Sequence, residues 1–529
     1  MDRRAFLSSV AGGWLVHTVL PGGGPVPGRI VGASHGVGHL LRDGGAPAPA
    51  GPPGRADVVI VGAGISGLSA AWRLGGLGLD VLVLELEPFV GGTSAWGEDG
   101  PVPYPWGAHY LAAPNPEARA ALRLLRDMGT VTGWDAAGRP MFDPKTLCHS
   151  PQERLFYQGA WHPGLVPADA LTREERDELA RFTAHEHALT ERLGSDGRHA
   201  FQIPVNLSSR DPEITALDRI SMAAWLDREG YRTPFLRWYV RYATLDDYGG
   251  APEDVSAWAG LHYFAARKLK TPELEGSHFL VWPEGNGRLA KELLQRGAPR
   301  VEKGALVTSV SPDADGVALT YVDVATRESR RLAARAVILA TPAFITQRLY
   351  PAAKGLPVRA SSPWLVANLH LRRPIDRDLP WDSVLYDGQG LGYVDAQHQL
   401  TSPAERTVLT YFRAYGEADV AAARTALVRE PWETLAENVL RDLAPAHPHL
   451  HDGLERLDLM IWGHAMPRPR PGFLGATPFE VPAALDARIA WAHVDQSGMA
   501  LFEEAQARGV RAAEIIARAV GVDPGETWL

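Results

Sequence analysis

The amino-acid sequence predicts an α/β protein in which a Rossmann-type domain is interleaved with an α+β domain. An apolar strand, a glycine-rich turn, a helix and a second apolar strand follow one another between residues 56 and 85. Further strand-like runs occupy residues 304–342, and an apolar run followed by a helix closes residues 489–520. Because alternating strands and helices form parallel sheets, the first stretch predicts an α/β unit, and the other two stretches contain further strands and a helix of the same kind.

Length and composition indicate more than one domain and no nucleic-acid partner. The chain has 529 residues, of which 45% are hydrophobic, and this exceeds the needs of one small core. The formal net charge is −9 without a long basic run, whereas phosphate backbones require a concentrated positive face. Cys148 is the single cysteine, which excludes an internal disulfide and a thiolate metal cage, and no other spacing predicts a metal site.

The first residues resemble a twin-arginine export signal. Arg3 and Arg4 precede Phe6 and Leu7 in the order that this signal requires, and the apolar stretch Ala5–Leu20 follows. This stretch is too short and too weakly apolar for a comfortable membrane span, so no integral membrane segment is expected. We expect a bacterial protein that the twin-arginine translocase exports to the periplasm or the extracellular space; the alternative is a disordered tail that contains an arginine pair.

The turn after the first predicted strand carries a dinucleotide fingerprint. The sequence Val-Gly-Ala-Gly-Ile-Ser-Gly occupies residues 61–67. Its first glycine permits a tight turn, the second lets the backbone approach a pyrophosphate, and the third lets the helix pack on the strand. The free N–H groups at the helix start favour phosphate, and Glu85 is placed to accept hydrogen bonds from a ribose. The contacts expected from this unit are Gly62, Ala63, Gly64, Ser66, Gly67 and Glu85.

The residues that follow this unit resemble those of flavin-dependent amine oxidases, phytoene desaturases and their relatives. Gly91 and Gly92 stand where that superfamily has a glycine pair, and residues 104–110 resemble its Gly-Ala-aromatic segment beside the flavin. Residues 282–342 resemble the segment that returns to the FAD domain, and residues 489–498 resemble the C-terminal strand and acidic residue. The further FAD contacts that the resemblance implies are Gly91, Gly92, Thr93, Gly107, Ala108, His109, Val307, Asp495, Ser497 and Gly498.

The resemblance covers residues 55–520 and implies the domain organisation. The expected parts are a signal and Gly/Pro-rich linker at 1–54, a glutathione-reductase-like, Rossmann-type FAD-binding domain at 55–115, 276–345 and 476–529, and an interleaved α+β substrate domain at 116–275 and 346–475. Residues 116–275 read mostly helical, with a capping box at Thr172. FAD is expected to bind without a covalent bond, because Cys148 lies outside the C-terminal region where the family sometimes attaches flavin.

Four positions depart from the family pattern. Thr93 stands where an arginine is usual, and His493 and Val494 precede the acidic Asp495 where glycine is common. The aromatic residue that often walls the amine site corresponds to Leu501. The strand expected to carry a lysine near flavin N5 matches residues 364–373, which contain no lysine. These departures leave FAD binding as the prediction and weaken the case for an ordinary oxygen-consuming amine oxidase.

Candidate catalytic residues fall in two segments of the substrate domain. Tyr393 and Trp462 are expected to flank a small-molecule substrate at the domain boundary. His464, His398 or His109 is a candidate for moving a proton, because imidazole titrates near neutral pH. For each histidine a hydrogen-bonded structural role is the alternative.

The predicted function is an exported FAD-dependent oxidoreductase that transfers a hydride from a substrate C–N or C–C bond to flavin N5. The substrate is expected to be an amine or an apolar compound, and the electron acceptor is oxygen or another molecule. Three alternatives stay open: a desaturase or isomerase of the same fold with a long apolar pocket, a nicotinamide-dependent dehydrogenase, and a flavin-binding protein without turnover.

Overall fold

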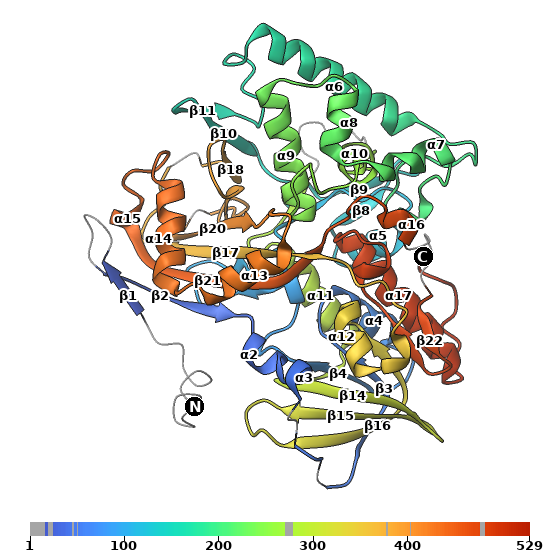
Figure 1. Ribbon diagram of the computed structural model, residues 1–529. Coiled ribbons are helices and arrows are strands. Elements are labelled where there is room, and N and C mark those ends of the chain that lie inside the picture. The colour runs from blue at the N-terminus through green and yellow to red at the C-terminus, as the bar shows by residue number, and fades with distance from the viewer. Residues whose placement is uncertain are drawn as a thin grey trace.

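The computed structural model describes residues 16–19, 25–44, 47–49, 51–269, 279–376, 379–402, 404–476 and 482–529. Two large sheets and a group of helices make up these residues (Figure 1). The arginine pair of the predicted export signal, with Phe6 and Leu7, lies outside the described residues.

One sheet contains the strands of the predicted Rossmann-type domain. In the described chain its strand order is β13-β4-β3-β16-β15-β14, and β23 adds to β16. β13, β4, β3, β16 and β23 run parallel, whereas β15 and β14 are antiparallel additions. Their bounds are β3 Gly54–Val61, β4 Val81–Glu85, β13 Arg300–Lys303, β14 Ala305–Asp313, β15 Gly316–Asp323, β16 Ser329–Leu339, β22 Ala484–Asp486 and β23 Ile489–Trp491. The predicted α/β class is confirmed.

Helices cover both faces of this sheet. The apolar sides of α4, α5, α11 and α17 pack on one face, and α12 packs on the other. α17 crosses α4 so closely that a Cβ at Gly509 would overlap the carbonyl oxygen of Ser66, and glycine is therefore required there. The bounds are α4 Ile65–Leu74, α5 Arg119–Asp127, α11 Gly287–Gly297, α12 Ala343–Leu349 and α17 Phe502–Ala519. The start of α4 consequently packs against the middle of α17.

The second sheet has the strand order β1-β2-β21-β17-β20-β19-β18-β10-β11 in the described chain. The bounds are β1 Val16–Val19, β2 Pro25–Gly32, β10 Glu153–Tyr157, β11 Ala160–Pro163, β17 Ser361–Leu371, β18 Asp382–Leu385, β19 Gly392–Asp395, β20 Thr407–Ala414 and β21 Leu454–Pro467. Every residue of β17 is buried, because α13 (Val420–Arg429) and α14 (Trp432–Leu443) cover one face and an aromatic cluster covers the other. Side chains alternate along a strand, so Trp364 and Val366 point to the aromatic cluster.

A helical region lies beyond this sheet, in green at the top of Figure 1. Its helices are α6 Arg173–Glu191, α7 Pro212–Thr215, α8 Met222–Arg228, α9 Pro234–Tyr248 and α10 Ala257–Ala265. The capping box at Thr172 is confirmed, because the Thr172 hydroxyl accepts the Glu175 N–H and the Glu175 carboxylate accepts the Thr172 N–H.

Shorter elements complete the fold. They are β5 Trp96–Gly97, β6 Tyr104–Pro105, β7 Tyr110–Ala112, β8 Val131–Trp134, β9 Pro140–Phe142, β12 Phe279–Val281, α2 His35–Gly38, α3 Leu40–Asp43, α15 Leu450–Gly453 and α16 Phe473–Ala476. Residues 131–163 thus form strands within the stretch expected to be mostly helical, and β10 and β11 extend the second sheet. No helix among the described residues is long and apolar enough to cross a membrane.

The interpretation of residues 1–54 as a signal and a linker is wrong for residues 25–43, which contain β2, α2 and α3. β2 pairs in parallel with β21, and α2 and α3 then pack beside the cofactor-domain sheet (Figure 1). The high glycine content misled the prediction, because Gly28 serves a close contact: a Cβ there would overlap the Trp432 ring and the Leu457 carbonyl oxygen. We call residues 34–43 the N-terminal cover.

Candidate active site

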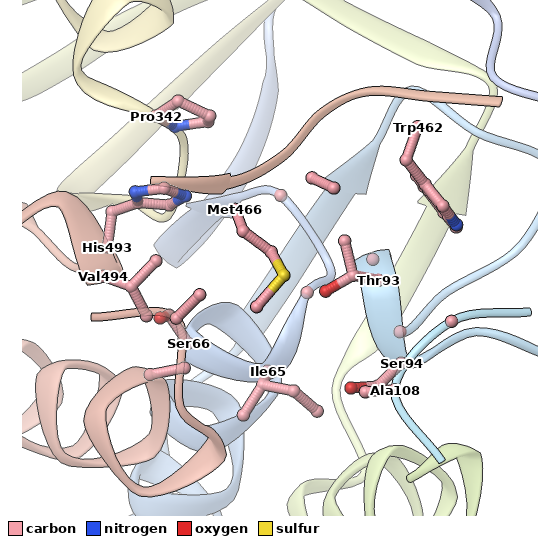
Figure 2. Close-up of a pocket in the computed structure, with 18 of the residues that line it drawn as sticks. Ile65, Ser66, Thr93, Ser94, Ala108, Pro342, Trp462, Met466, His493 and Val494 are labelled. Atoms are coloured by element: carbon pink, nitrogen blue, oxygen red, sulfur yellow. The ribbon is translucent and has the colours of Figure 1, made fainter. Parts of the chain in front are cut away.

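One cavity of about 490 Å³ lies between the Rossmann-type sheet and the second sheet. Figure 2 shows side chains from separate stretches of chain around it: Ile65 and Ser66, Thr93 and Ser94, Ala108, Pro342, Trp462 and Met466, and His493 and Val494. The predicted cofactor residues that line it are Gly62, Gly64, Ser66, Glu85, Gly91, Gly92, Thr93, Gly107, Ala108, His109 and Val307. The structure therefore brings together predicted cofactor residues that are up to 245 positions apart in the sequence, from Gly62 to Val307.

The glycine-rich turn forms a bare cradle in the cavity wall. Gly62 has a φ of +102°, and a Cβ there would come within 2.6 Å of the Ala340 carbonyl oxygen. A Cβ at Gly67 would overlap the carbonyl oxygen of Gly62. At Gly64, by contrast, the nearest atom to an added Cβ is the Gly92 Cα at 4.0 Å, so this backbone faces open space. A pyrophosphate fits such a surface, where α4 also directs its N-terminus.

Glu85 ends β4 at the cavity wall. The N–H groups of Ala63 and Glu87 donate to its two carboxylate oxygens at 2.7 and 2.9 Å. Burial raises the pKa of Glu85 to about 7, and the backbone hydrogen bonds act in the opposite direction. A carboxylate so placed accepts hydrogen bonds well, and a ribose diol would supply the donors that compensate its burial.

Five of the predicted cofactor residues do not line the cavity. Ala63 donates its N–H to Glu85, and Gly67 packs against the turn. Asp495 is not among the residues that line the cavity. Its Oδ2 accepts the Ala343 N–H at 2.8 Å and lies 3.3 Å from the His493 Nδ1, whereas its buried Oδ1 has no hydrogen-bond partner among the described residues. A direct role of Asp495 therefore stays a prediction, and its neighbours His493 and Val494 line the wall.

Ser497 and Gly498 likewise hold the loop rather than face the cavity. The Ser497 hydroxyl donates to the Val494 carbonyl oxygen at 3.2 Å. Gly498 has a φ of +81°, and a Cβ there would meet the Arg359 guanidinium at 2.8 Å. The loop therefore positions the start of α17, whose first residues Leu501 and Phe502 do line the cavity.

The N-terminal cover contributes wall residues that the sequence did not predict. Gly38 and Leu41 line the cavity near Glu85 and Leu306. The cover is held by two hydrogen bonds from Ser34, whose N–H and hydroxyl donate to the Glu87 carboxylate at 2.8 and 2.6 Å. Apolar contacts between Val37, Leu306 and Val322 add to these.

Aromatic side chains line the other part of the cavity, which we call the chamber. Its wall residues are Trp364, Val366, Phe412, Trp462, His464, Met466 and Leu501. The Trp462 ring is fixed by its Nε1–H, which donates to the Trp106 carbonyl oxygen at 2.6 Å. β17 contributes Trp364 and Val366, so the strand on which the family usually carries a lysine presents an apolar surface here.

Of the candidate histidines, His109 and His464 line the cavity. His109 is buried and His464 is exposed to the cavity or to solvent. Desolvation lowers the pKa of each ring to about 4, and nearby Arg424 also lowers that of His464, so both rings are neutral at pH 7. His398 lies elsewhere, with its ring nitrogens 3.2 and 2.9 Å from the carbonyl oxygens of Leu379 and His149, and its role is structural.

Tyr393 is not a cavity residue, and its assignment as a substrate-flanking residue is wrong. Its ring is buried in the cluster between β19 and α14. Its hydroxyl lies 3.0 Å from Arg154 Nη2, which donates to it, and 2.7 Å from His447 Nε2. Side-chain alternation along β19 explains the correction, because Tyr393 points to the face that the helices cover.

Charged residues from three segments also reach the cavity wall. They are Asp246 and Asp247 at the end of α9, Arg267 after α10, and Glu503 in the first turn of α17. Sequence reasoning missed them, since residues so far apart carry no common motif. Among the described residues, no group of three or more histidine, cysteine or acidic side chains is arranged to hold a metal ion.

The cradle and the chamber together fit an oxidoreductase that holds a nucleotide cofactor beside its substrate. The chain belongs to the family of flavin containing amine oxidoreductases, whose model matches residues 65–517. It is therefore a flavin-dependent enzyme, and the bare turn, the acidic Glu85 and the continuous cavity fit a flavin dinucleotide.

Curated relatives match over a short stretch. AofH of Mycobacterium tuberculosis is 41% identical over 81 residues, which are 15% of this chain and 17% of that protein. The flavin-containing amine oxidase B of the dog is 40% identical over 80 residues, or 15% of each chain. The matched segment is thus a small part of the curated relatives.

Solved structures match over most of the chain. A putrescine oxidase bound to putrescine has a TM-score of 0.62 at 16% identity, covering 88% of this chain and all of that one. Cyclohexylamine oxidase from Brevibacterium oxydans has a TM-score of 0.60 at 18% identity, covering 88% and 98%. At these identities the likeness establishes the fold.

Proposed function

We propose that the protein binds FAD without a covalent bond and oxidises an amine at its carbon–nitrogen bond. The observation that best supports this is the continuity of one cavity from the glycine cradle to the aromatic chamber. An elongated dinucleotide requires such continuity if its reactive ring is to meet a substrate. The family to which the chain belongs points to the same chemistry.

FAD, when bound, supplies the acceptor for a hydride from the substrate carbon, while the amine nitrogen loses a proton and an imine results. Oxygen or another oxidant then takes up the two electrons. The cradle at Gly64 and the N-terminus of α4 bind the phosphates, and Glu85 binds the ribose. The first turn of α17 directs its positive end to the cavity at Phe502, which favours negative charge there.

The chamber prepares the amine for oxidation by excluding water. An ammonium group surrounded by Trp364, Phe412 and Trp462 loses hydration, and this lowers its pKa toward the reactive neutral form. Neutral His109 and His464 in the wall offer ring nitrogens for the released proton. Desolvation of the amine depends on the buried aromatic rings, and acceptance of the proton depends on the positions of the two histidines in the wall.

Non-covalent binding is supported by the position of the single cysteine. Cys148 is buried beside His149 and does not line the cavity. Burial also raises the pKa of this thiol above its ordinary value, which disfavours the nucleophilic thiolate. A thioether to the cofactor therefore has no candidate sulfur.

Export by the twin-arginine translocase to the periplasm or the extracellular space is part of the proposal. Its support is the Arg3–Arg4 pair followed by Phe6 and Leu7. A route that carries folded chains suits a protein whose cofactor cavity is closed by segments from across the whole sequence. Fusion of residues 1–24 to a reporter tests it: export that persists after Arg3 and Arg4 are replaced by lysine contradicts this assignment.

The catalytic proposal is tested on the purified full chain. Flavin absorbance that is released into solution on acid precipitation supports non-covalent FAD, and anaerobic bleaching by primary amines supports oxidation at the C–N bond. The second candidate function is that of a desaturase or isomerase, and the aromatic chamber without a lysine on β17 supports it. Bleaching by polyenes alone would favour this candidate. Flavin that no amine and no polyene reduces would contradict both.

A further inference from the structure

Positive charge is scarce in the wall of the cavity. The pyrophosphate of a dinucleotide is negatively charged, and it needs hydrogen-bond donors when it leaves water. Among the described residues, Arg267 is the one arginine or lysine that lines the cavity, and it lies 3.6 Å from the Asp247 carboxylate. Thr93 stands where the family usually has an arginine. The cradle and the N-terminus of α4 supply backbone donors, and a side-chain donor must come from another residue.

Three parallel strands bring His493 to the same edge of the sheet as the cradle. β3, β16 and β23 are neighbours in this order, and their carboxyl ends lead into residues 62–67, 340–342 and 492–493. Adjacent strands lie about 4.8 Å apart, so His493 follows a strand about 10 Å from the strand that leads to the cradle. Figure 2 shows the His493 ring in the cavity wall beside Pro342. The ring therefore faces the space next to the cradle.

The loop after β16, which lies between the other two, has few donors left for a ligand. The Ala340 N–H donates to the Val61 carbonyl oxygen at 2.8 Å. Pro342 lines the cavity and has no N–H, and the N–H of Ala343 donates to Asp495 at 2.8 Å. The loop after β23 can supply the missing donor.

Contacts within this loop fix the His493 ring and leave one ring nitrogen free to donate. The Asp495 N–H donates to His493 Nδ1 at 3.1 Å, so the hydrogen of the neutral ring is on Nε2. When the ring is protonated, Nδ1 can donate to Asp495 Oδ2, which lies 3.3 Å away, and Nε2 keeps its hydrogen. No hydrogen bond or ion pair joins Nε2 to another residue in the described part of the chain. In both protonation states Nε2 is thus a donor without a protein partner.

We infer that His493 is a phosphate-binding residue, whose Nε2 donates to the pyrophosphate of FAD together with the N-terminus of α4. The inference rests on the proposed binding of FAD. His493 stands where glycine is common in the family, so this donor is particular to the present chain and compensates for Thr93 at the arginine position. Asp495 is a positioning residue, because it holds the ring and does not itself line the cavity.

The test compares side chains with and without a donor at this position. His493→Phe keeps a ring without a donor, and the FAD dissociation constant of the full chain is expected to rise on the order of thirtyfold. His493→Gln keeps an amide donor and should stay within about threefold of the native value. Flavin fluorescence during dilution measures release. Phosphorus NMR of the flavin-loaded chain reports the pyrophosphate directly, and its resonances should shift in His493→Phe.

The matched control is His187→Phe, which replaces an exposed histidine of α6 outside this cavity and should change neither the affinity nor the phosphorus spectrum. Thermal unfolding shows that each variant is folded. Native FAD affinity and unchanged phosphorus resonances in His493→Phe would overturn the inference, as would a loss in His493→Gln as large as that in His493→Phe. Release of FMN instead of FAD from the native chain would contradict the proposed cofactor itself. The measurements need no substrate, so they decide the role of His493 even if no amine reduces the flavin.

Discussion

The two parts of the cavity differ in what builds them. The cradle is made of backbone, with bare peptide groups at Gly62, Gly64 and Gly92, whereas the chamber is made of side chains. A backbone surface tolerates few residue types, so it leaves glycines at fixed spacings in the sequence. A side-chain surface can be built from many residues on many segments. Cofactor binding can therefore be predicted from this sequence, whereas the choice of substrate cannot.

The most damaging change to the cradle is expected from Gly67→Val. Its side chain would overlap the Gly62 carbonyl oxygen and displace α4 from β3. We expect loss of flavin from the purified protein and destabilisation of about 3 kcal/mol or more. Flavin absorbance and thermal unfolding measure the two effects. Gly133→Ala is the control, because a Cβ added at this position meets no atom within 4 Å. If Gly67→Val retained flavin, the backbone of the cradle would not be essential for cofactor binding.

The residues of the backbone cradle could be predicted from the sequence, whereas most side chains that line the rest of the cavity could not. Residues 61–67 and Glu85 could be assigned because the turn, the helix start and the acidic residue are consecutive parts of one unit. Asp495 lies in a loop whose residues His493 and Val494 line the cavity, but its own contact with the Ala343 N–H is a tertiary one that no local pattern predicts. The pairing of Asp246 with Tyr110 depends on how α9 meets β7, which no local pattern records.

The N-terminal cover shows a limit of composition as a guide. Glycine and proline are frequent in flexible linkers and also where strands pack closely, and Gly28 serves the second purpose. The predicted linker therefore contains β2 and wall residues of the cavity, and its contribution to cofactor binding can be measured.

Disrupting the cover should weaken flavin binding without unfolding the protein. Val37 is buried against Leu306 and Val322, so Val37→Asp places a charge in an apolar contact. We expect the dissociation constant of FAD to rise on the order of thirtyfold, or about 2 kcal/mol. Flavin fluorescence during dilution measures release. His35→Asp on the exposed side of α2 is the control, and equal effects of both changes would show that the cover does not depend on this contact.

The smallest effect on catalysis is expected at Tyr393. Tyr393→Phe removes hydrogen bonds with Arg154 and His447 outside the cavity, which should lower the free energy of unfolding by about 1–2 kcal/mol. Amine-dependent flavin bleaching should stay within twofold of the native rate, because no cavity surface changes. Trp462→Phe is the counterpart: it loses the bond to the Trp106 carbonyl oxygen and reshapes the chamber, so substrate affinity should fall severalfold. A folded Tyr393→Phe variant with strongly slowed bleaching would mean that the sheet beyond the chamber wall, and not the wall alone, controls the reaction.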